Sequence, residues 1–327
     1  CNIASDVTIS NIGEYIANYS IEEQAVISNC GKILTEGVTS FGNGIQVSVL
    51  NEAGGRKVKI WDRLSAHEAY ILTLYRHKTK AIENIGEMID EYASGISSSI
   101  GIIGKNSRIS NCSKIRNTRI GEFTSIDSAL SLDEGSINSS VNDPVKIGYG
   151  VILDNFIISS GSIITDSAIL SKCFIGQGCI IGRQFSAENS LFFSNCQGFH
   201  GEACSVFAGP YTTTHHKSTL LIAGLFSFMN AGSGTNQSNH MYKLGPVHQG
   251  IMERGSKTAS GSFILWPAHI GPFSMIMGKH YSNPDISNLP FSYLIEGKEG
   301  SMLYPGINLA NIGTIRDCQK WPLRDRR

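Results

Sequence analysis

Aliphatic side chains recur every six residues in the middle of the chain, most regularly at Ile157, Ile163, Ile169, Ile175 and Ile181. Because an α-helix repeats near 3.6 residues and a strand near 2, a strict six-residue period matches neither element alone. The period is typical of a solenoid in which each hexapeptide forms one short strand and one corner. Three hexapeptides then close a coil, which stacks about 4.8 Å from the next. We therefore predict parallel strands here, with these isoleucines inside a shared core.

Changes in this period divide the chain into four segments. Residues 1–62 start with six-residue spacing and are predicted to be a first β-helix segment. Residues 63–95 follow helical spacing instead: Ser65 and Glu68 fit a capping box, Gly95 fits a helix stop, and Gly86 allows a break into two helices. Residues 96–280 are predicted to be the main β-helix, with irregular polar loops from about residue 197. Residues 281–327 are predicted to be a solvated C-terminal tail or cap.

The composition agrees with turn-rich β structure and limits the classes of partner that the protein is expected to bind. The chain has 35 glycines and only 17% charged residues, and its 27 basic residues equal its 27 acidic ones, which argues against nucleic acid. The apolar run 220–229 is too short to cross a bilayer, so we expect no membrane contact. The eight cysteines show no CxxC spacing, and we expect free thiols, with Cys173 and Cys179 buried. From the expected free thiols we predict a cytoplasmic protein.

Histidines and other polar side chains concentrate where the six-residue period fails. Six of the nine histidines lie between residues 200 and 269, although a solenoid needs no histidine for stability. We predict one cleft beside the solenoid, formed by His200, His215, His216 and His240 together with Asn236, Asn239 and Lys217. Because adjacent side chains diverge in a strand, only one of His215 and His216 should face it, and His216 is the better choice. No metal is predicted, although a zinc site built through folding is an alternative.

Two stretches resemble known families. The run Ile175-Gly176-Gln177-Gly178-Cys179-Ile180 resembles the hexapeptide-repeat superfamily of left-handed parallel β-helices. Residues 209–224 and 236–246 resemble a bacterial family named as related to UDP-N-acetylglucosamine pyrophosphorylase. The resemblance implies an all-β fold, a single-stranded left-handed parallel β-helix with an α-helical insertion, and further sequence before Cys1. The glycine-rich nucleotide loop and βαβ units of a nucleotidyltransferase domain are not visible in the sequence.

The resemblance also implies a transferase of the hexapeptide-repeat class. Such enzymes move an acyl group from acetyl-CoA or another acyl thioester to a sugar or nucleotide-sugar, with a histidine as general base because its pKa lies near the working pH. The catalytic candidates are His216, His215, His200 and Glu202. Amides would bind sugar hydroxyls and cations would bind phosphates, which makes the substrate-binding candidates Lys217, Asn236, Gln237, Asn239, His240, Lys243, Arg254 and Lys257.

A non-catalytic reading stays open beside the transferase. In that alternative the chain is a β-helix assembly module, or a sugar-nucleotide-binding module related to sugar-nucleotide pyrophosphorylases. We expect a homo-oligomer in either case. Binding of an acyl thioester, and loss of turnover when His215 or His216 is replaced, distinguishes the enzyme from the module.

Overall fold

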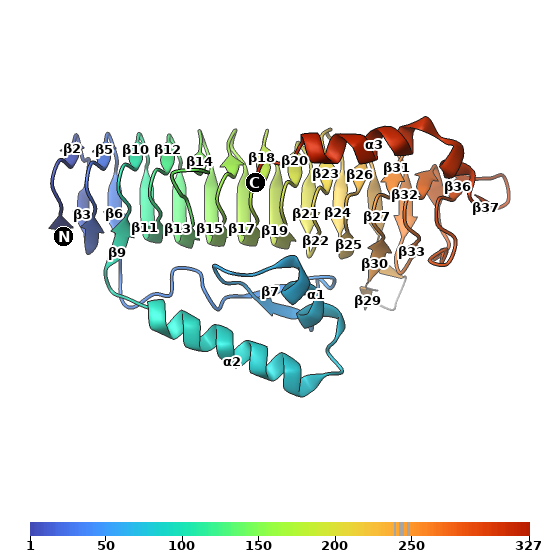
Figure 1. Ribbon diagram of the computed structural model, residues 1–327, viewed down its shortest axis with the longest axis horizontal. Coiled ribbons are helices and arrows are strands. Elements are labelled where there is room, and N and C mark those ends of the chain that lie inside the picture. Colours follow the sequence, from blue (N-terminus) through green and yellow to red (C-terminus); the bar gives the residue numbers. More distant parts are fainter. Residues whose placement is uncertain (239, 242–244, 247–248) are drawn as a thin grey trace.

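The protein is a parallel β-helix. Its computed structural model describes residues 1–238, 240–241, 245–246 and 249–327. Short strands from successive coils pair in parallel and build sheets that run the whole length of the solenoid (Figure 1). Ile152 pairs with Ile169, and Ile169 pairs with Ser186, so one coil takes 17 residues in this region.

Two long sheets form most of the wall. Within the described residues, the first consists of β1 (Asn2–Ile3), β3 (Tyr15–Ala17), β4 (Tyr19–Ile21), β6 (Lys32–Leu34), β9 (Gly101–Ile103), β11 (Lys114–Ile120), β13 (Ser131–Ile137), β15 (Ile152–Ile158), β17 (Ile169–Ile175), β19 (Ser186–Phe192), β21 (Glu202–Cys204), β22 (Phe207–Ala208), β24 (Leu220–Ile222), β25 (Gly224–Phe226), β30 (Gly250–Met252) and β33 (His269–Ile270). The second consists, in the same ranges, of β2 (Thr8–Ser10), β5 (Val26–Ser28), β10 (Arg108–Ser110), β12 (Ser125–Asp127), β14 (Lys146–Ile147), β16 (Ile163–Ile164), β18 (Ile180–Gly182), β20 (Gln197–Phe199), β23 (Thr213–Thr214), β26 (Asn230–Ala231), β31 (Lys257–Thr258), β34 (Met275–Met277), β36 (Tyr293–Glu296) and β37 (Ser301–Tyr304).

The remaining elements lie beside these sheets. A small parallel sheet contains β27 (Asn236–Ser238), β32 (Phe263–Leu265) and β35 (Lys279–His280). Two antiparallel pairs are formed by β7 (Gln46–Ser48) with β8 (Lys57–Lys59), and by β28 (His240–Met241) with β29 (Gly245–Pro246). The helices are α1 (Ala66–Leu74), α2 (Thr79–Ile96), the short 3₁₀ helix η1 (Ile307–Ala310) and α3 (Ile312–Leu323).

The side chains inside the coil are only partly those predicted. The core positions of this region are Ile158, Ile164, Leu170, Ile175 and Ile181, all at most 1% exposed. The prediction is wrong for Ile157, Ile163 and Ile169: Ile169 is 49% exposed, Ile163 is partly exposed, and Ile157 is buried outside the coil. A 17-residue coil has two six-residue sides and one five-residue side. Residues spaced strictly by six therefore shift by one position in each coil. The series starts on the outer face at Ile157 and reaches the inner face one coil later, at Ile175.

Residues 36–98 leave the solenoid and return to it. The coil before this excursion pairs directly with the coil after it, because Val26 lies opposite Arg108 and Lys32 opposite Lys114. At one corner, asparagine side chains continue across the junction: Asn29 donates to Asn111 at 3.2 Å. The excursion is thus an insertion that the solenoid accommodates without losing register.

The insertion is larger than the sequence pattern suggested. The expected boundary at residue 62 leaves β7 and β8 in the β-helix, but these strands form an antiparallel hairpin that shares a core with the helices. Ser65 accepts from the Glu68 amide at 3.1 Å, as the capping box predicts, whereas the Glu68 carboxylate accepts from Trp61 Nε1. The break between the helices falls between α1 and α2 at residues 75–78, and Gly86 lies within α2.

A second hydrophobic core joins the insertion to the solenoid. Register places five apolar side chains one above another on the outer face of successive coils: Ile157, Phe174, Leu191, Phe207 and Leu225. We call this set the outer apolar column. Val58, Leu72 and Ile89 of the insertion are buried against it. Burial of this column removes apolar area from water and holds the insertion along the solenoid wall.

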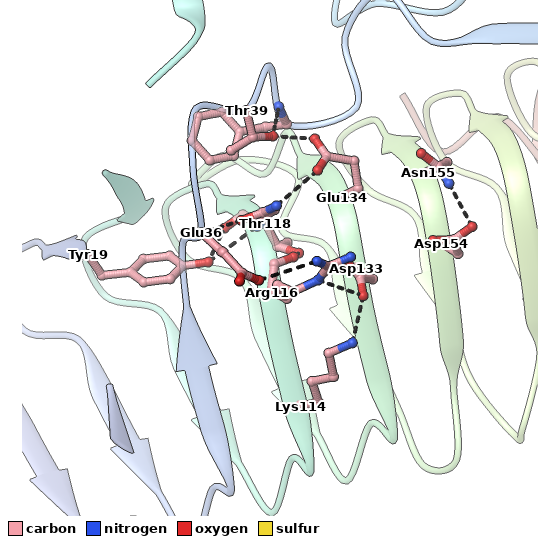
Figure 2. A network of polar contacts seen from close by, with 12 residues as sticks. Tyr19, Glu36, Thr39, Lys114, Arg116, Thr118, Asp133, Glu134, Asp154 and Asn155 are labelled. Carbon is pink, nitrogen blue, oxygen red and sulfur yellow. Dashed lines mark hydrogen bonds and ion pairs between the residues drawn. The ribbon is translucent and has the colours of Figure 1, made fainter. Parts of the chain in front are cut away.

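A charged network lies where the chain leaves the solenoid (Figure 2). Asp133 accepts from Arg116 Nε at 2.8 Å and from Lys114 Nζ at 2.7 Å, and Arg116 also pairs with Glu36 at the start of the insertion. Next to it, Thr39 donates to Glu134. These contacts fix the first residues of the insertion to β11 and β13.

The Asp133→Asn substitution should lower the free energy of unfolding by about 1–2 kcal/mol. Asp133 is 8% exposed, but its two cationic partners are about one-third exposed, and water reduces the loss. Asp154 occupies the equivalent place one coil later and accepts only from Asn155 and Ser171 among the described residues. Urea unfolding of the Asp133→Asn and Asp154→Asn variants measures the loss of free energy of unfolding at each position. Equal losses in the two variants would contradict this account of the network.

The helix α3 packs along the edge of the solenoid that lies away from the insertion in Figure 1, whereas Arg327 at the end of the chain lines a pocket together with residues of the insertion. Trp321 of α3 lies with its ring centroid 4.8 Å from that of Phe228 and 6.3 Å from that of Phe273. Lys257 of β31 forms an ion pair with Asp317, and Asn195 donates to Asp325 at 2.9 Å. The segment predicted to be a solvated tail or cap therefore adds β36 and β37 to the second sheet and then forms a helix docked on the solenoid.

Candidate functional site

A groove lies between α1 and the far end of the outer apolar column. The α1 helix begins at the Ser65 cap, and the hairpin β7–β8 holds it against the wall through the second core. Phe207 and Leu225 continue the column past the part that the insertion covers most closely, so they form the floor. The groove has an apolar lobe and a polar lobe, and Ala66, His67 and Pro210 line both.

The apolar lobe has a volume of about 720 Å³. Its floor is Phe207, Leu225 and Phe228, and its α1 wall is Tyr70, Ile71 and Tyr75. These three α1 side chains are all exposed, between 40% and 45%, although each is large and apolar or aromatic. A group of exposed apolar side chains around a cavity indicates a binding surface. At its rim, the Arg254 guanidinium lies 4.0 Å from the centre of the Phe228 ring.

The polar lobe has a volume of about 460 Å³ and a mixed lining, in which Leu64, Phe174 and Phe193 lie beside more polar groups than in the apolar lobe. Hydroxyl and amide side chains of successive coils point to it, namely Asn138, Ser159, Ser160, Gln177 and Ser194. Arg327 contributes a guanidinium, which pairs with Asp325 at 2.7 Å. The first turn of α1 also lines this lobe, and a helix N-terminus carries a partial positive charge. The Asp62 carboxylate lines the lobe as well, and the lobe can therefore accept a polar group.

His67 is the one titratable side chain, among those the structure describes, that lines both lobes. It is exposed on the first turn of α1. Sequence reasoning missed this residue because it looked for histidines in the segment after residue 197. The available signal was the capping box itself, since Ser65 fixes where α1 starts and thus which side chains surround its N-terminus.

A second, smaller pocket of about 190 Å³ lies between α3 and the second sheet. It brings together two predicted residues, His215 and Lys257, with Arg316, Lys320 and Arg324 of the C-terminal segment. His215 Nε2 lies 2.6 Å from Gln197 Oε1, and its ring stacks on Phe199. Burial lowers the pKa of His215, and the positive charge of Arg324 lowers it further.

The other predicted histidines do not join this pocket. His215 lines it, whereas His216 is exposed, which is the reverse of the choice made from sequence. The two rings are 6.5 Å apart at their centroids. His200 is partly exposed at a corner with positive φ, and Lys217 and Glu202 are exposed. Glu202 lies in β21, paired with Leu220 of the next coil.

The remaining predicted residues are dispersed. Asn236 is exposed on β27, whereas Gln237 is buried and accepts from the Ile222 amide at 2.9 Å, which is a structural contact. Arg254 lines the apolar lobe of the groove. The predictions for Asn239 and Lys243, and for the side chain of His240, fall outside the described residues.

Three expectations concern features outside these pockets. All eight cysteines are free thiols, and Cys173 and Cys179 are buried as predicted. Within the described ranges, no group of three or more histidine, cysteine or carboxylate side chains has an arrangement that could hold a metal ion. In the same ranges, no helix is both long enough and apolar enough to cross a membrane.

Comparison with known proteins places the whole chain in one family of proteins without an assigned activity. The family described as "Domain of unknown function (DUF4954)" matches residues 1–327. A protein of Treponema pallidum (strain Nichols), described as an uncharacterized protein, is 25% identical over 345 residues. That alignment covers 100% of this chain and 47% of the relative, so the chain spans about half of the relative's length.

Proposed function

The chain belongs to the DUF4954 family, and we propose that it is a transferase that binds an acyl thioester in the groove along α1. The observation that carries the proposal is the junction of two unlike lobes at one histidine. An apolar lobe of about 720 Å³ suits an acyl chain, and a polar lobe of about 460 Å³ suits its polar carrier or the acceptor. His67 lines both lobes, where the thioester carbonyl of such a ligand would lie.

The reaction proposed is acyl transfer to a hydroxyl group. His67 accepts the proton of the hydroxyl while its oxygen attacks the thioester carbonyl and forms the new C–O bond. The C–S bond then breaks, and the leaving thiolate takes the proton from His67. The first turn of α1, which lines the polar lobe, would stabilise the negative charge on the carbonyl oxygen in the tetrahedral intermediate.

The nature of the acceptor rests on the sequence resemblance. Residues 209–224 and 236–246 resemble the family named as related to UDP-N-acetylglucosamine pyrophosphorylase, which favours a sugar or nucleotide-sugar. The start of the first stretch lies at the groove, because Gly209 and Pro210 are in its lining. Hydroxyl and amide side chains in the polar lobe, such as Asn138 and Gln177, are suitable partners for sugar hydroxyls.

The groove should bind acyl thioesters more tightly as the acyl chain lengthens. Each methylene placed in the apolar lobe contributes about 0.8 kcal/mol, or about fourfold in Kd, until the lobe is full. Replacing Ile71 by glutamate places a charge in this lobe and should weaken binding of an octanoyl thioester by at least about tenfold. Calorimetric titration with acetyl, butanoyl, hexanoyl and octanoyl thioesters provides the measurement.

The matched control is Met88→Glu. Met88 is also an exposed apolar residue of an insertion helix, 45% exposed against 40% for Ile71, and it lines neither lobe. Binding that does not change with chain length, or that falls equally in both variants, would exclude the groove as an acyl site. Chain-length-dependent binding without turnover on any sugar acceptor would instead favour the non-catalytic binding module.

A further inference from the structure

We propose that the pocket beneath α3 binds a phosphate or diphosphate group of a small anionic ligand. The pocket has a volume of about 190 Å³ and lies between α3 and strands β23, β26 and β31 of the second sheet. Four cationic side chains line it, namely Lys257, Arg316, Lys320 and Arg324. Asp317 is the one acidic side chain, among the described residues, in this lining.

Within the described residues, the protein neutralises only part of the positive charge of the pocket. Asp317 pairs with Lys257 and lies 3.7 Å from Arg316. Lys320 lies in the last turn of α3 and Arg324 is the C-cap residue that follows it, and within the described part of the chain neither side chain forms an ion pair. Burial lowers the pKa of Lys257, and the positive charges of Arg316 and Lys320 lower it further, so these cations repel one another across the pocket. An anion bound between them would remove this repulsion.

The solenoid wall supplies neutral polar groups opposite these cations. Thr213, Asn230 and His215 line the pocket from β23, β26 and the residue that follows β23. The Thr213 hydroxyl donates to the Tyr211 carbonyl at 3.3 Å. His215 uses Nε2 for Gln197 and leaves Nδ1 for another partner. Three cations of the C-terminal segment on one side, and Lys257 with amide and imidazole groups on the other, form a suitable arrangement for phosphate oxygens.

Aromatic contacts hold α3 against the solenoid wall. Trp321 lies between Phe228 and Phe273, and Gly255 occupies the corner between these two coils. A side chain at Gly255 would meet the Phe273 ring, since an added Cβ would lie 2.5 Å from it. The glycine corner therefore leaves room for the Phe273 ring, against which Trp321 packs, and Trp321 itself lines the pocket. Its indole is a natural reporter of binding.

This inference is independent of the proposed acyl transfer. It concerns a different cavity, and its test uses inorganic anions and requires neither an acyl ligand nor turnover. The full chain is titrated with inorganic phosphate and with diphosphate by calorimetry and by tryptophan fluorescence. Chloride keeps the ionic strength constant, because salt screens charges at this distance. A parallel titration with a nucleoside diphosphate tests whether the group is recognised as part of a larger ligand.

The test variant is Lys320→Gln/Arg324→Gln, and its matched control is Lys279→Gln/Lys298→Gln. The control removes two exposed cations that do not line this pocket. We expect saturable binding in the native chain, at least about tenfold weaker binding in the test variant, and unchanged binding in the control. A fluorescence change that accompanies binding should disappear in Trp321→Phe.

Three results would overturn the proposal. The first is a heat signal that does not saturate, because it shows only a general effect of salt. The second is equal weakening in the test variant and the control, which assigns binding to net charge. The third is binding of either anion by the native chain without any change in Trp321 fluorescence. Circular dichroism and thermal melting of each variant ensure that lost binding does not reflect unfolding.

Discussion

Replacing His67 by alanine should lower the rate of acyl transfer by about 10²–10⁴-fold, the usual contribution of a general base. The proposed reaction needs a group that takes the acceptor proton at the junction of the two lobes, and His67 lines both. Because His67 would act on the proton and not on the acyl chain, Kd for the acyl thioester should change little. Turnover of a thioester with a sugar acceptor and calorimetric Kd are measured on the same preparations.

The control for this prediction is His77→Ala. His77 lies in the short link between α1 and α2, stacks near Tyr75 and lines neither lobe of the groove. It should retain native turnover. If both variants keep full activity, His67 is not the base; if His67→Ala loses activity together with thioester binding, the residue contributes to binding and not to proton transfer.

Replacing Phe156 by alanine should lower the free energy of unfolding by about 3–5 kcal/mol. Phe156 is fully buried, and its ring lies over Gly135 of the neighbouring coil. A Cβ added to Gly135 would lie 2.4 Å from that ring. Glycine at this position therefore provides the space that the aromatic ring fills. Truncation of the ring leaves a cavity that the closely stacked coils cannot easily close.

The complementary substitution makes this prediction sharper. Gly135→Val alone should destabilise the native chain by about 1–3 kcal/mol through overpacking. In the Phe156→Ala background the same valine should cost much less, because the cavity accepts its side chain, and a double-mutant cycle measures the difference. Urea unfolding of the four proteins gives the values. Additive losses would show that the two residues do not share one space.

The fold was predictable from sequence, but the phase of its repeat was not fully so. The six-residue spacing indicated a β-helix because a solenoid places one side chain of each short strand inside. The spacing of five between Ile115 and Ile120 recurs once in every 17-residue coil. If this five-residue spacing is taken as a regular part of the repeat, the pattern places Ile158 and Ile164 inside the coil. A run of sixes that began at Ile157 concealed this five-residue spacing, because the outer face is also apolar there.

The candidate site depended on contacts that a linear sequence does not show. Phe207 and Leu225 become a groove floor only when register aligns them with Phe174 and when α1 packs beside them. His67 belongs to a helix far from the histidine-rich segment. The basic C-terminal segment seemed solvated because the residues that hold it, Phe228 and Asn195, are about 100 positions or more earlier in the chain. Apolar residues at alternate outward positions were the available signal for a covered face.

The most direct test of the account is to locate the acyl chain on the protein. A thioester whose octanoyl chain carries a photoreactive diazirine is bound to the full chain and irradiated, and mass spectrometry identifies the labelled peptides. The account predicts labelling of residues 66–81 on α1 and its link to α2, and of residues 207–228 on the groove floor, with native octanoyl thioester competing and Ile71→Glu reducing the yield. Labelling that falls elsewhere on the solenoid, or that the native thioester does not compete away, would contradict the assignment of the groove.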